Sequence, residues 1–227
     1  MTPPQDAPRR FDVRRDLAGV ADLIEHCFTN TLDADGYGFV RRMHSLAHSQ
    51  KTLGWATLPA ERALQMQGFV WEENGQIVGN LSLIPATALG KRTYLIANVA
   101  VHPDWRRRGI ARMLTDRALA YMRGRGIQTA YLQVREENQA AYDLYISEGF
   151  QEFARRTTWH SSLLTAAETL PKLPVGFKIT ARRRGDWQEQ RAWLERLYPP
   201  EVRWHLPLDI NLFQDGLAGA FKRMLYD

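Results

Sequence analysis

The sequence predicts an α/β or α+β fold in which helices cover a central β-sheet, and three observations support this. Residues 68–73 and 76–83 are strand patterns joined by Asn74-Gly75, a pair that tolerates the positive φ angles of a tight hairpin. Residues 93–101 are nearly continuously apolar, as expected of a strand buried on both faces. The chain then alternates helix and strand patterns, an order typical of a sheet layered by helices.

The chain up to residue 123 adds four more elements. Residues 11–14 alternate apolar and polar side chains, which predicts a short strand. An amphipathic helix opens at Asp16-Leu17, and a weaker helical pattern covers residues 33–47. Apolar residues at helical spacing then predict a helix over residues 109–123.

The second half of the predicted sheet follows that helix. Residues 129–134 predict another buried strand. Asn138 is a suitable N-cap for the next helix, and Gly149 is a suitable left-handed stop for it. Residues 150–164 suit a long strand with a polar centre.

The composition is that of an ordinary globular protein. The 227 residues are 44% hydrophobic and 24% charged, with 30 Lys and Arg against 25 Asp and Glu, a net charge of +5. That mild excess suits acidic small ligands as readily as nucleic acid. The single cysteine, Cys27, excludes an internal disulfide framework, and no apolar run approaches the roughly 20 residues that cross a bilayer. We expect a cytoplasmic protein without a membrane partner.

The chain is longer than one compact domain needs, and we expect four parts. These are a flexible leader at residues 1–10, a main domain at 11–164, a proline-containing linker at 165–176, and a C-terminal extension at 177–227. Residues 177–180 and the amphipathic stretch after them resemble residues 11–14 and their helix. The extension is either an incomplete second copy that packs on the main domain, or the source of that domain's final strand.

The residues with the clearest chemistry follow the buried strand that ends at Val99-Ala100-Val101. Arg106-Arg107-Arg108 leads into Gly109, whose freedom in φ lets the backbone turn tightly just before a helix. Amides at a helix N-terminus attract an anion, and arginines can add bidentate contacts. The pattern is neither a Walker loop nor the dinucleotide Gly-x-Gly-x-x-Gly motif. Taken alone, it also fits a turn with a solvated basic edge.

Two motifs in order resemble the GNAT superfamily of acyl-CoA-dependent N-acyltransferases. Arg106, Gly109 and Ala111 match its Arg/Gln-x-x-Gly-x-Gly/Ala motif after a buried strand. A second block, Asn-x-x-Ala-x-x-Leu-Tyr-x-x-x-Gly-Phe, is matched by Asn138, Ala141, Leu144, Tyr145, Gly149 and Phe150. The resemblance covers residues 11–164 and implies a mixed, mostly antiparallel sheet flanked by helices.

The resemblance also implies roles for the matched residues. Main-chain amides of residues 107–111 would hold the pyrophosphate of acetyl-CoA beside Arg106, the strand end would pair with the pantetheine arm, and Asn138 would reach that arm. Tyr145 would be the general acid that protonates the leaving thiolate. The implied coenzyme-binding residues are Val99, Ala100, Val101, Arg106, Arg107, Arg108, Gly109, Ile110, Ala111 and Asn138.

A general base is not evident. Gln133 stands where acetyltransferases of ribosomal-protein N-termini have Glu, and Leu95 stands near the Glu of a histone-acetylating subclass. Glu136 and Glu137 are a charged pair that suits the start of a helix. The acceptor is therefore expected to be a small-molecule or peptide amine that loses its proton to water or another group.

The remaining expectations concern an alternative function, the oligomeric state, and the binding of nucleic acid and metal. A non-catalytic acyl-CoA sensor is the alternative function, and a homodimer is left open. No nucleic acid partner is expected, because acids separate the arginine runs at 106–108 and 182–184 and no binding module appears. No metal site is expected either, since Ser45 follows His44 where a zinc-protease pattern would have Glu.

Overall fold

The computed structural model describes residues 7–29, 31–32, 34–53, 67–155, 157, 173–180, 183–198 and 210–214. The chain divides into two units, Met1–Gln151 and Glu152–Asp227. The first unit contains the sheet and every predicted site residue. In the second unit, the described helix α6 (Trp187–Leu197) confirms the predicted amphipathic stretch. No helix among the described residues is long and apolar enough to span a membrane.

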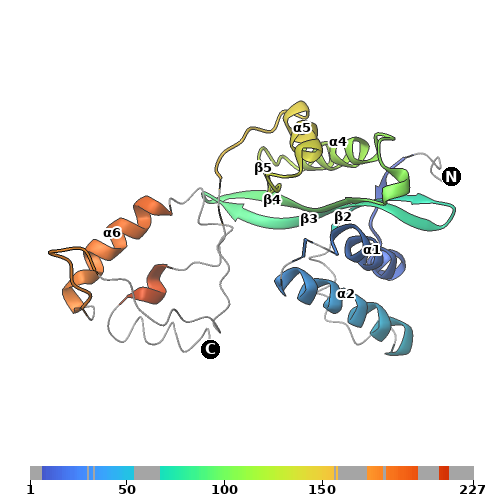
Figure 1. Cartoon of the computed structure of the whole chain (residues 1–227). Helices are drawn as coiled ribbons and strands as arrows, with labels where there is room; N and C mark the ends of the chain where they lie inside the picture. Colours follow the sequence, from blue (N-terminus) through green and yellow to red (C-terminus); the bar gives the residue numbers. More distant parts are fainter. Residues whose placement is uncertain are drawn as a thin grey trace. The chain divides into compact units, whose positions relative to one another are not determined.

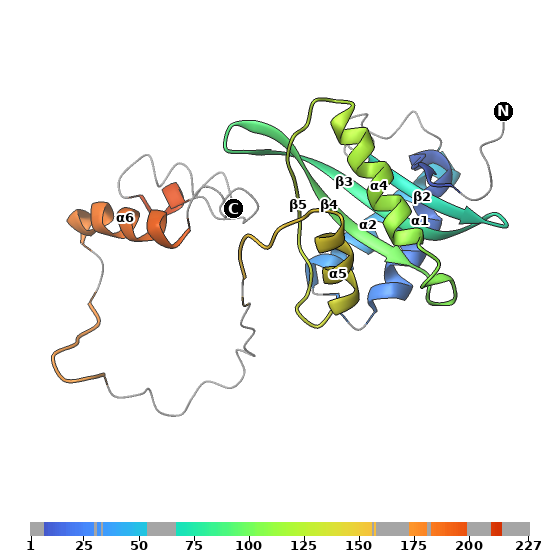
Figure 2. The same ribbon diagram turned by 90° about the horizontal axis from the view of Figure 1, so that it is seen from above.

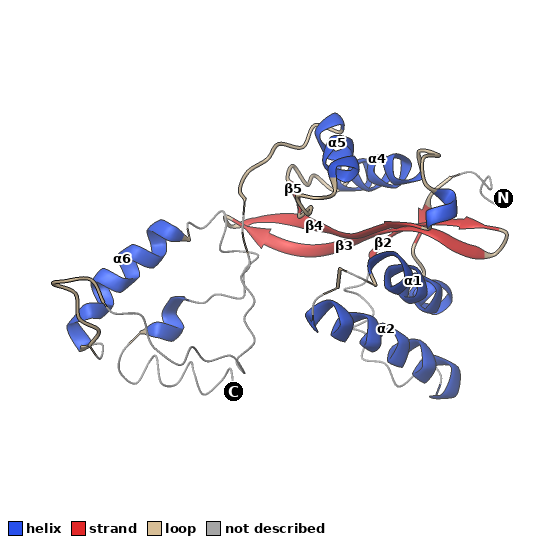
Figure 3. Cartoon of the chain, in the orientation of Figure 1, coloured by secondary structure: helices blue, strands red, loops and turns tan. Residues whose placement is uncertain are grey.

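The sheet of the first unit has five strands in chain order (Figure 3). The strands are β1 (Arg9–Arg10), β2 (Gln67–Glu73), β3 (Gln76–Ala88), β4 (Lys91–Val101) and β5 (Ala130–Leu132). Neighbours pair antiparallel except β4 and β5, which are parallel. This confirms the predicted mixed, mostly antiparallel sheet.

Two tight turns make β2, β3 and β4 a continuous meander. Asn74 and Gly75 have φ of 48° and 80°, so both adopt the left-handed region that a two-residue hairpin requires. A second turn, Leu89-Gly90, has φ of 52° and 73° and pairs Ala88 with Lys91. The sequence analysis missed this turn because Leu is an unusual residue at positive φ. Strands β3 and β4 are longer than predicted for that reason.

Helices cover both faces of the sheet (Figure 1). Helices α1 (Val13–Phe28) and α2 (Ala34–Leu53) lie on one face, and α4 (Ile110–Arg123) and α5 (Gln139–Ser147) lie on the other. Alternation along β2 builds two cores, because Phe69 and Trp71 pack with the α4 cluster while Val70 packs with the α1 and α2 cluster. Helix α4 runs over the sheet and leads into the segment that returns as β5 (Figure 2).

The predicted strand at residues 129–134 is shorter in the structure, β5 at Ala130–Leu132, and three other predicted strands are not found where they were expected. The first strand is β1 at Arg9–Arg10 rather than residues 11–14, because Asp12 accepts a hydrogen bond from the amide of Arg14 and caps α1. Residues 150–155 and 157 are not strand, and the rest of the predicted strand up to residue 164 lies outside the described residues. Residues 177–180 are exposed and not in a strand, so the strand of the proposed repeat is not formed.

Candidate functional site

The end of β4 is distorted by a β-bulge. Ala97 pairs with Ser82 and Ala100 pairs with Asn80, so two β4 residues, Asn98 and Val99, face one residue of β3. Asn98 adopts a positive φ of 51°. Asn80 is 2% exposed, and its side-chain amide donates a hydrogen bond of 2.8 Å to the Asn98 carbonyl oxygen. A buried side chain therefore holds the bulge in place.

Strand β4 continues after β5 has ended. The parallel pairing joins residues 94–96 of β4 to Ala130–Leu132, and no pairing continues beyond Ile96 in the described part of the chain. Strand β4 runs on to Val101, and its edge on the β5 side therefore has backbone donors and acceptors without a ladder partner. An extended ligand can hydrogen-bond to such an edge as an added strand does.

The open edge leads directly into a loop that presents amides. After the short 3-10 helix η2 (Pro103–Trp105), Arg107 and Gly109 have φ of 64° and 79°. Left-handed residues within a turn point successive N–H groups into one concavity. Among the described residues, no hydrogen-bond acceptor meets the amides of residues 107–111. Gly109 is also the N-cap of α4, where the helix dipole favours a negative charge.

Two of the three loop arginines donate hydrogen bonds to nearby backbone carbonyls, one at the end of β4 and one in η2. Arg106 Nε donates to the Val101 carbonyl oxygen at 3.1 Å, and an Arg108 amino group donates to the Asp104 carbonyl oxygen at 3.1 Å. The Arg108 guanidinium also stacks on Trp105, 4.4 Å from the ring centroid. These contacts keep positive charge beside the amide concavity.

The second motif supplies the start and the buried face of α5. Asn138 is exposed, and its side-chain oxygen accepts from the Ala141 amide at 3.2 Å, which confirms the predicted N-cap. Tyr145 is 7% exposed and packs edge-on against Phe150, with ring centroids 5.8 Å apart. Its hydroxyl has no hydrogen-bond partner within the described residues. Burial raises the pKa of Tyr145 to about 12, which keeps the phenol protonated.

Helix α1 adds a residue that the sequence analysis did not place in the site. Cys27 donates through Sγ to the Val101 carbonyl oxygen at 3.4 Å. Burial raises the pKa of its thiol, while the nearby Arg106 acts in the opposite direction. The 74-residue separation between Cys27 and Val101 explains why no local pattern revealed this contact.

The groups weighed as bases or metal ligands are not brought together. Gln133 lies exposed beyond β5, and Glu136 and Glu137 are in an exposed turn before α5. His44 contacts Glu25 at 3.2 Å and Asp22 at 3.8 Å. No group of three metal-ligating side chains is found in the described ranges.

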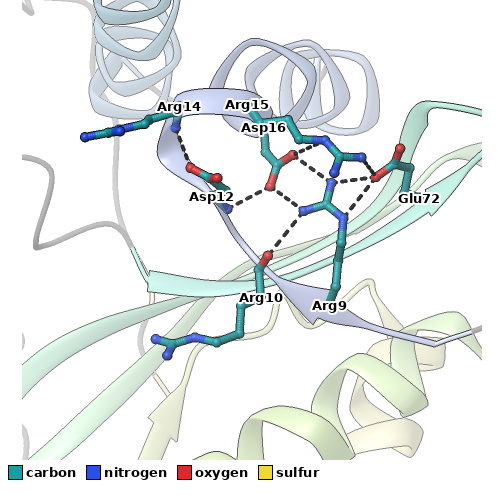
Figure 4. A network of polar contacts seen from close by, with 7 residues as sticks. All are labelled: Arg9, Arg10, Asp12, Arg14, Arg15, Asp16 and Glu72. Carbon is teal, nitrogen blue, oxygen red and sulfur yellow. Dashed lines mark hydrogen bonds and ion pairs between the residues drawn. The ribbon is translucent and has the colours of Figure 1, made fainter. Parts of the chain in front are cut away.

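An open cavity of about 560 Å³ lies elsewhere, between α1 and the β2–β3 hairpin. Arg9 on its wall forms a bidentate ion pair with the buried Asp16, in which both hydrogen bonds are 2.7 Å long (Figure 4). Arg9 also donates to Glu72. Arg15 contacts the same Glu72 oxygen. None of the predicted coenzyme-binding residues lines this cavity, so we place the functional site at the β4 end, where the amides and open edge are.

Comparisons with known proteins find acetyltransferases. Residues 38–150 match the model of the Acetyltransferase (GNAT) family. The chain is 33% identical over 124 residues to a [ribosomal protein bS18]-alanine N-acetyltransferase of Escherichia coli, which covers 55% of this chain and 78% of that protein. It is 47% identical over 53 residues to a mycothiol acetyltransferase of Thermobifida fusca, covering 23% of this chain and 16% of that protein.

A solved structure shares the fold. It is an aminoglycoside N-acetyltransferase in complex with coenzyme A, and it is 14% identical to this chain. The TM-score is 0.50, with 68% of this chain and 93% of that chain covered. The similarity indicates the same arrangement of helices and sheet.

Proposed function

The chain belongs to the GNAT acetyltransferase family, and from this premise we propose that it transfers an acetyl group from acetyl-CoA to a primary amine. One observation supports this most directly. The open edge of β4 is followed, after the short helix η2, by the amide concavity of residues 107–111 at the N-terminus of α4. The two features match the extended pantetheine arm and the adjoining pyrophosphate of one ligand.

The pyrophosphate and the pantetheine arm each have a partner in this proposal. The pyrophosphate accepts hydrogen bonds from the loop amides, with Arg106, Arg107 and Arg108 supplying positive charge. The pantetheine amides pair with the backbone of Val99, Ala100 and Val101, and Asn138 reaches the same arm. Because Arg106 and Cys27 already contact the Val101 carbonyl oxygen, they define where the pantetheine approaches this strand end.

The acetyl transfer proceeds by direct attack in a ternary complex. The neutral amine nitrogen adds to the thioester carbonyl carbon, and a backbone amide at the β4 bulge donates to the oxyanion that forms. The carbon–sulfur bond then breaks, the thiolate leaves, and the nitrogen loses its proton to water. The amide product results, and the released thiolate takes up a proton from solvent to give the free thiol of coenzyme A.

Tyr145 acts on the leaving thiolate. An alkyl thiol has a pKa of about 8.5, so a full proton transfer from a phenol with a pKa near 12 is uphill by roughly 5 kcal/mol. The hydroxyl therefore donates a hydrogen bond to the sulfur as negative charge develops. Proton transfer becomes favourable only to the extent that bound substrates lower the pKa of the phenol.

The acceptor is a primary amine of a peptide or a small molecule. The relatives named for bS18-alanine and mycothiol acetylation support testing both kinds. Gln133 in place of a carboxylate implies that a solvent molecule takes the amine proton. We therefore expect the rate to rise with pH as the acceptor amine becomes neutral.

The test is to incubate the protein with acetyl-CoA and a panel of amines while free thiol is measured. The panel includes a peptide with N-terminal alanine, polyamines and amino sugars. Thiol release that requires both the amine and the protein supports the proposal. Tight coenzyme A binding without turnover across the panel would instead support the non-catalytic sensor.

A further inference from the structure

Four exposed arginines from separate segments gather around aromatic side chains at the C-terminal end of α4. Three of them lie over aromatic rings. The guanidinium carbons of Arg125 and Arg10 are 3.9 Å and 4.9 Å from the centroid of the Tyr121 ring. The guanidinium carbon of Arg117 is 5.9 Å from the centroid of the Phe69 ring. The fourth, Arg92, lies two residues before Tyr94 on β4 and therefore on the same face of the sheet, and the Tyr94 ring centroid is 6.4 Å from that of Tyr121. The arginine patch is Arg10, Arg92, Arg117 and Arg125.

The charge of this patch is not neutralised by acids. Among the described residues, none of the four arginines forms an ion pair with a carboxylate. Arginines on other surfaces do so: Arg9 with Asp16 and Glu72, and Arg112 with Glu148. Four positive charges are therefore held on one surface without a carboxylate partner among the described residues.

The guanidinium groups are held in position before any ligand arrives. Arg10 donates to the Tyr121 hydroxyl at 3.2 Å, and that hydroxyl donates to Gln67 Oε1 at 3.1 Å. Tyr94 donates to the same oxygen at 3.4 Å, so Gln67 anchors both phenols. A guanidinium stacked on a ring keeps its N–H edges free for bidentate contacts with phosphate or carboxylate.

The surroundings favour a nucleic acid backbone over a protein partner. The aromatic side chains within the patch are covered, since Phe69 and Tyr94 are buried and Tyr121 is half-buried beneath arginines. Protein interfaces have an apolar centre, whereas nucleic acid interfaces are more polar and more positive. The covered Tyr121 ring is also a poor platform for a base. We propose that the arginine patch binds the phosphate backbone of nucleic acid without sequence preference.

This surface is distinct from the coenzyme site proposed above. Helix α4 has 14 residues, so Arg125, beyond its C-terminal end, lies about 20 Å from the amide concavity, and Arg117, eight residues after Gly109, lies about 12 Å along the helix from it. The arginine runs that the sequence analysis weighed, 106–108 and 182–184, are not part of it. Their exclusion as a nucleic acid site therefore does not bear on these four residues.

The test is fluorescence anisotropy of a labelled 20-nucleotide poly(U) RNA against the full chain at several salt concentrations. With four phosphate contacts the slope of log K against log salt is about −2.8, a roughly 50-fold loss of affinity between 50 and 200 mM salt. For Arg10→Gln/Arg117→Gln/Arg125→Gln we expect weaker binding and a slope of about −0.7, a roughly threefold loss over the same range.

A charge-matched control is Arg41→Gln/Arg42→Gln/Arg196→Gln, which removes three exposed arginines from α2 and α6. It should keep the wild-type slope, and saturating coenzyme A should leave RNA binding unchanged. The proposal fails if the wild type does not bind at 50 mM salt, if both triple variants lose affinity equally, or if coenzyme A displaces the RNA. Stronger displacement by poly-glutamate than by unlabelled poly(U) would assign the patch to an acidic protein.

Discussion

Replacing Gly109 by alanine tests the coenzyme site at its most constrained residue. With φ at 79°, an L-residue there costs about 1–2 kcal/mol, of which roughly 0.4–1 kcal/mol is offset by the less flexible unfolded chain. The added Cβ meets nothing closer than Met113 Cε at 3.8 Å, so no clash contributes. We expect a loss of about 1 kcal/mol in the free energy of unfolding, measured by urea denaturation.

The same substitution should weaken coenzyme A binding much more than it weakens the fold. If the strained backbone relaxes, the amides turn away from the pyrophosphate, and one charge-assisted hydrogen bond is worth about 1.5–3 kcal/mol, or roughly 10- to 150-fold in affinity. Isothermal titration of wild type and variant with coenzyme A measures this loss.

Gly75→Ala is the matched control, since Gly75 has φ of 80° and open space around it in a hairpin turn outside the site. It should lose the same stability and keep the wild-type affinity for coenzyme A. Wild-type affinity in Gly109→Ala, with the stability loss present, would refute the assignment of the pyrophosphate to this loop. Equal losses of affinity in both variants would refute it as well, because the effect would then be general.

Three further substitutions test the other parts of the structure. Tyr145→Phe should lower kcat by roughly 10- to 150-fold, the value of one charge-assisted hydrogen bond to the sulfur, while coenzyme A affinity and stability change little because the hydroxyl has no partner to lose in the described structure; unchanged turnover at every pH would exclude its role. Asn80→Ala should lower the free energy of unfolding by about 1–3 kcal/mol, since it removes the buried amide that donates to the Asn98 carbonyl oxygen. A smaller loss on urea denaturation would show that the bulge does not depend on this hydrogen bond. Glu72→Gln should destabilise the protein at neutral pH, because Arg9 lowers the pKa of the Glu72 carboxyl in the folded state. That difference from wild type should shrink below the unfolded-state pKa of about 4.3 and vanish below the folded-state value; a constant difference from pH 7 to pH 3 would contradict it.

Local signals predicted the elements that frame the site. Asn74-Gly75 and Gly109 occupy positive φ as expected, and Asn138 caps α5. These predictions hold because a turn or a cap depends on residues within a few positions of each other. One prediction from a local pattern was wrong. At residues 11–14 the strand alternation was misleading, because the Asp12 side chain caps α1 instead.

The functional surfaces, in contrast, depend on residues far apart in the chain. The bulge at Asn98 arises from the register between β3 and β4, and the open edge arises because β5 ends before β4 does. No local pattern encodes a register or the length of a neighbouring strand. The contact between Cys27 and Val101 has the same origin.

The motifs of the chain thus sufficed for its family, its mixed sheet and the loop before α4, because each motif is a short run whose backbone conformation follows from its own residues. Three-dimensional packing was needed to show that Tyr145 is buried, that β4 has a free edge, and that Arg10, Arg117 and Arg125 meet over aromatic rings. Burial, strand pairing and the summation of charge on a surface all depend on which distant segments become neighbours. A net charge of +5 gave no indication of where unpaired positive charge would gather.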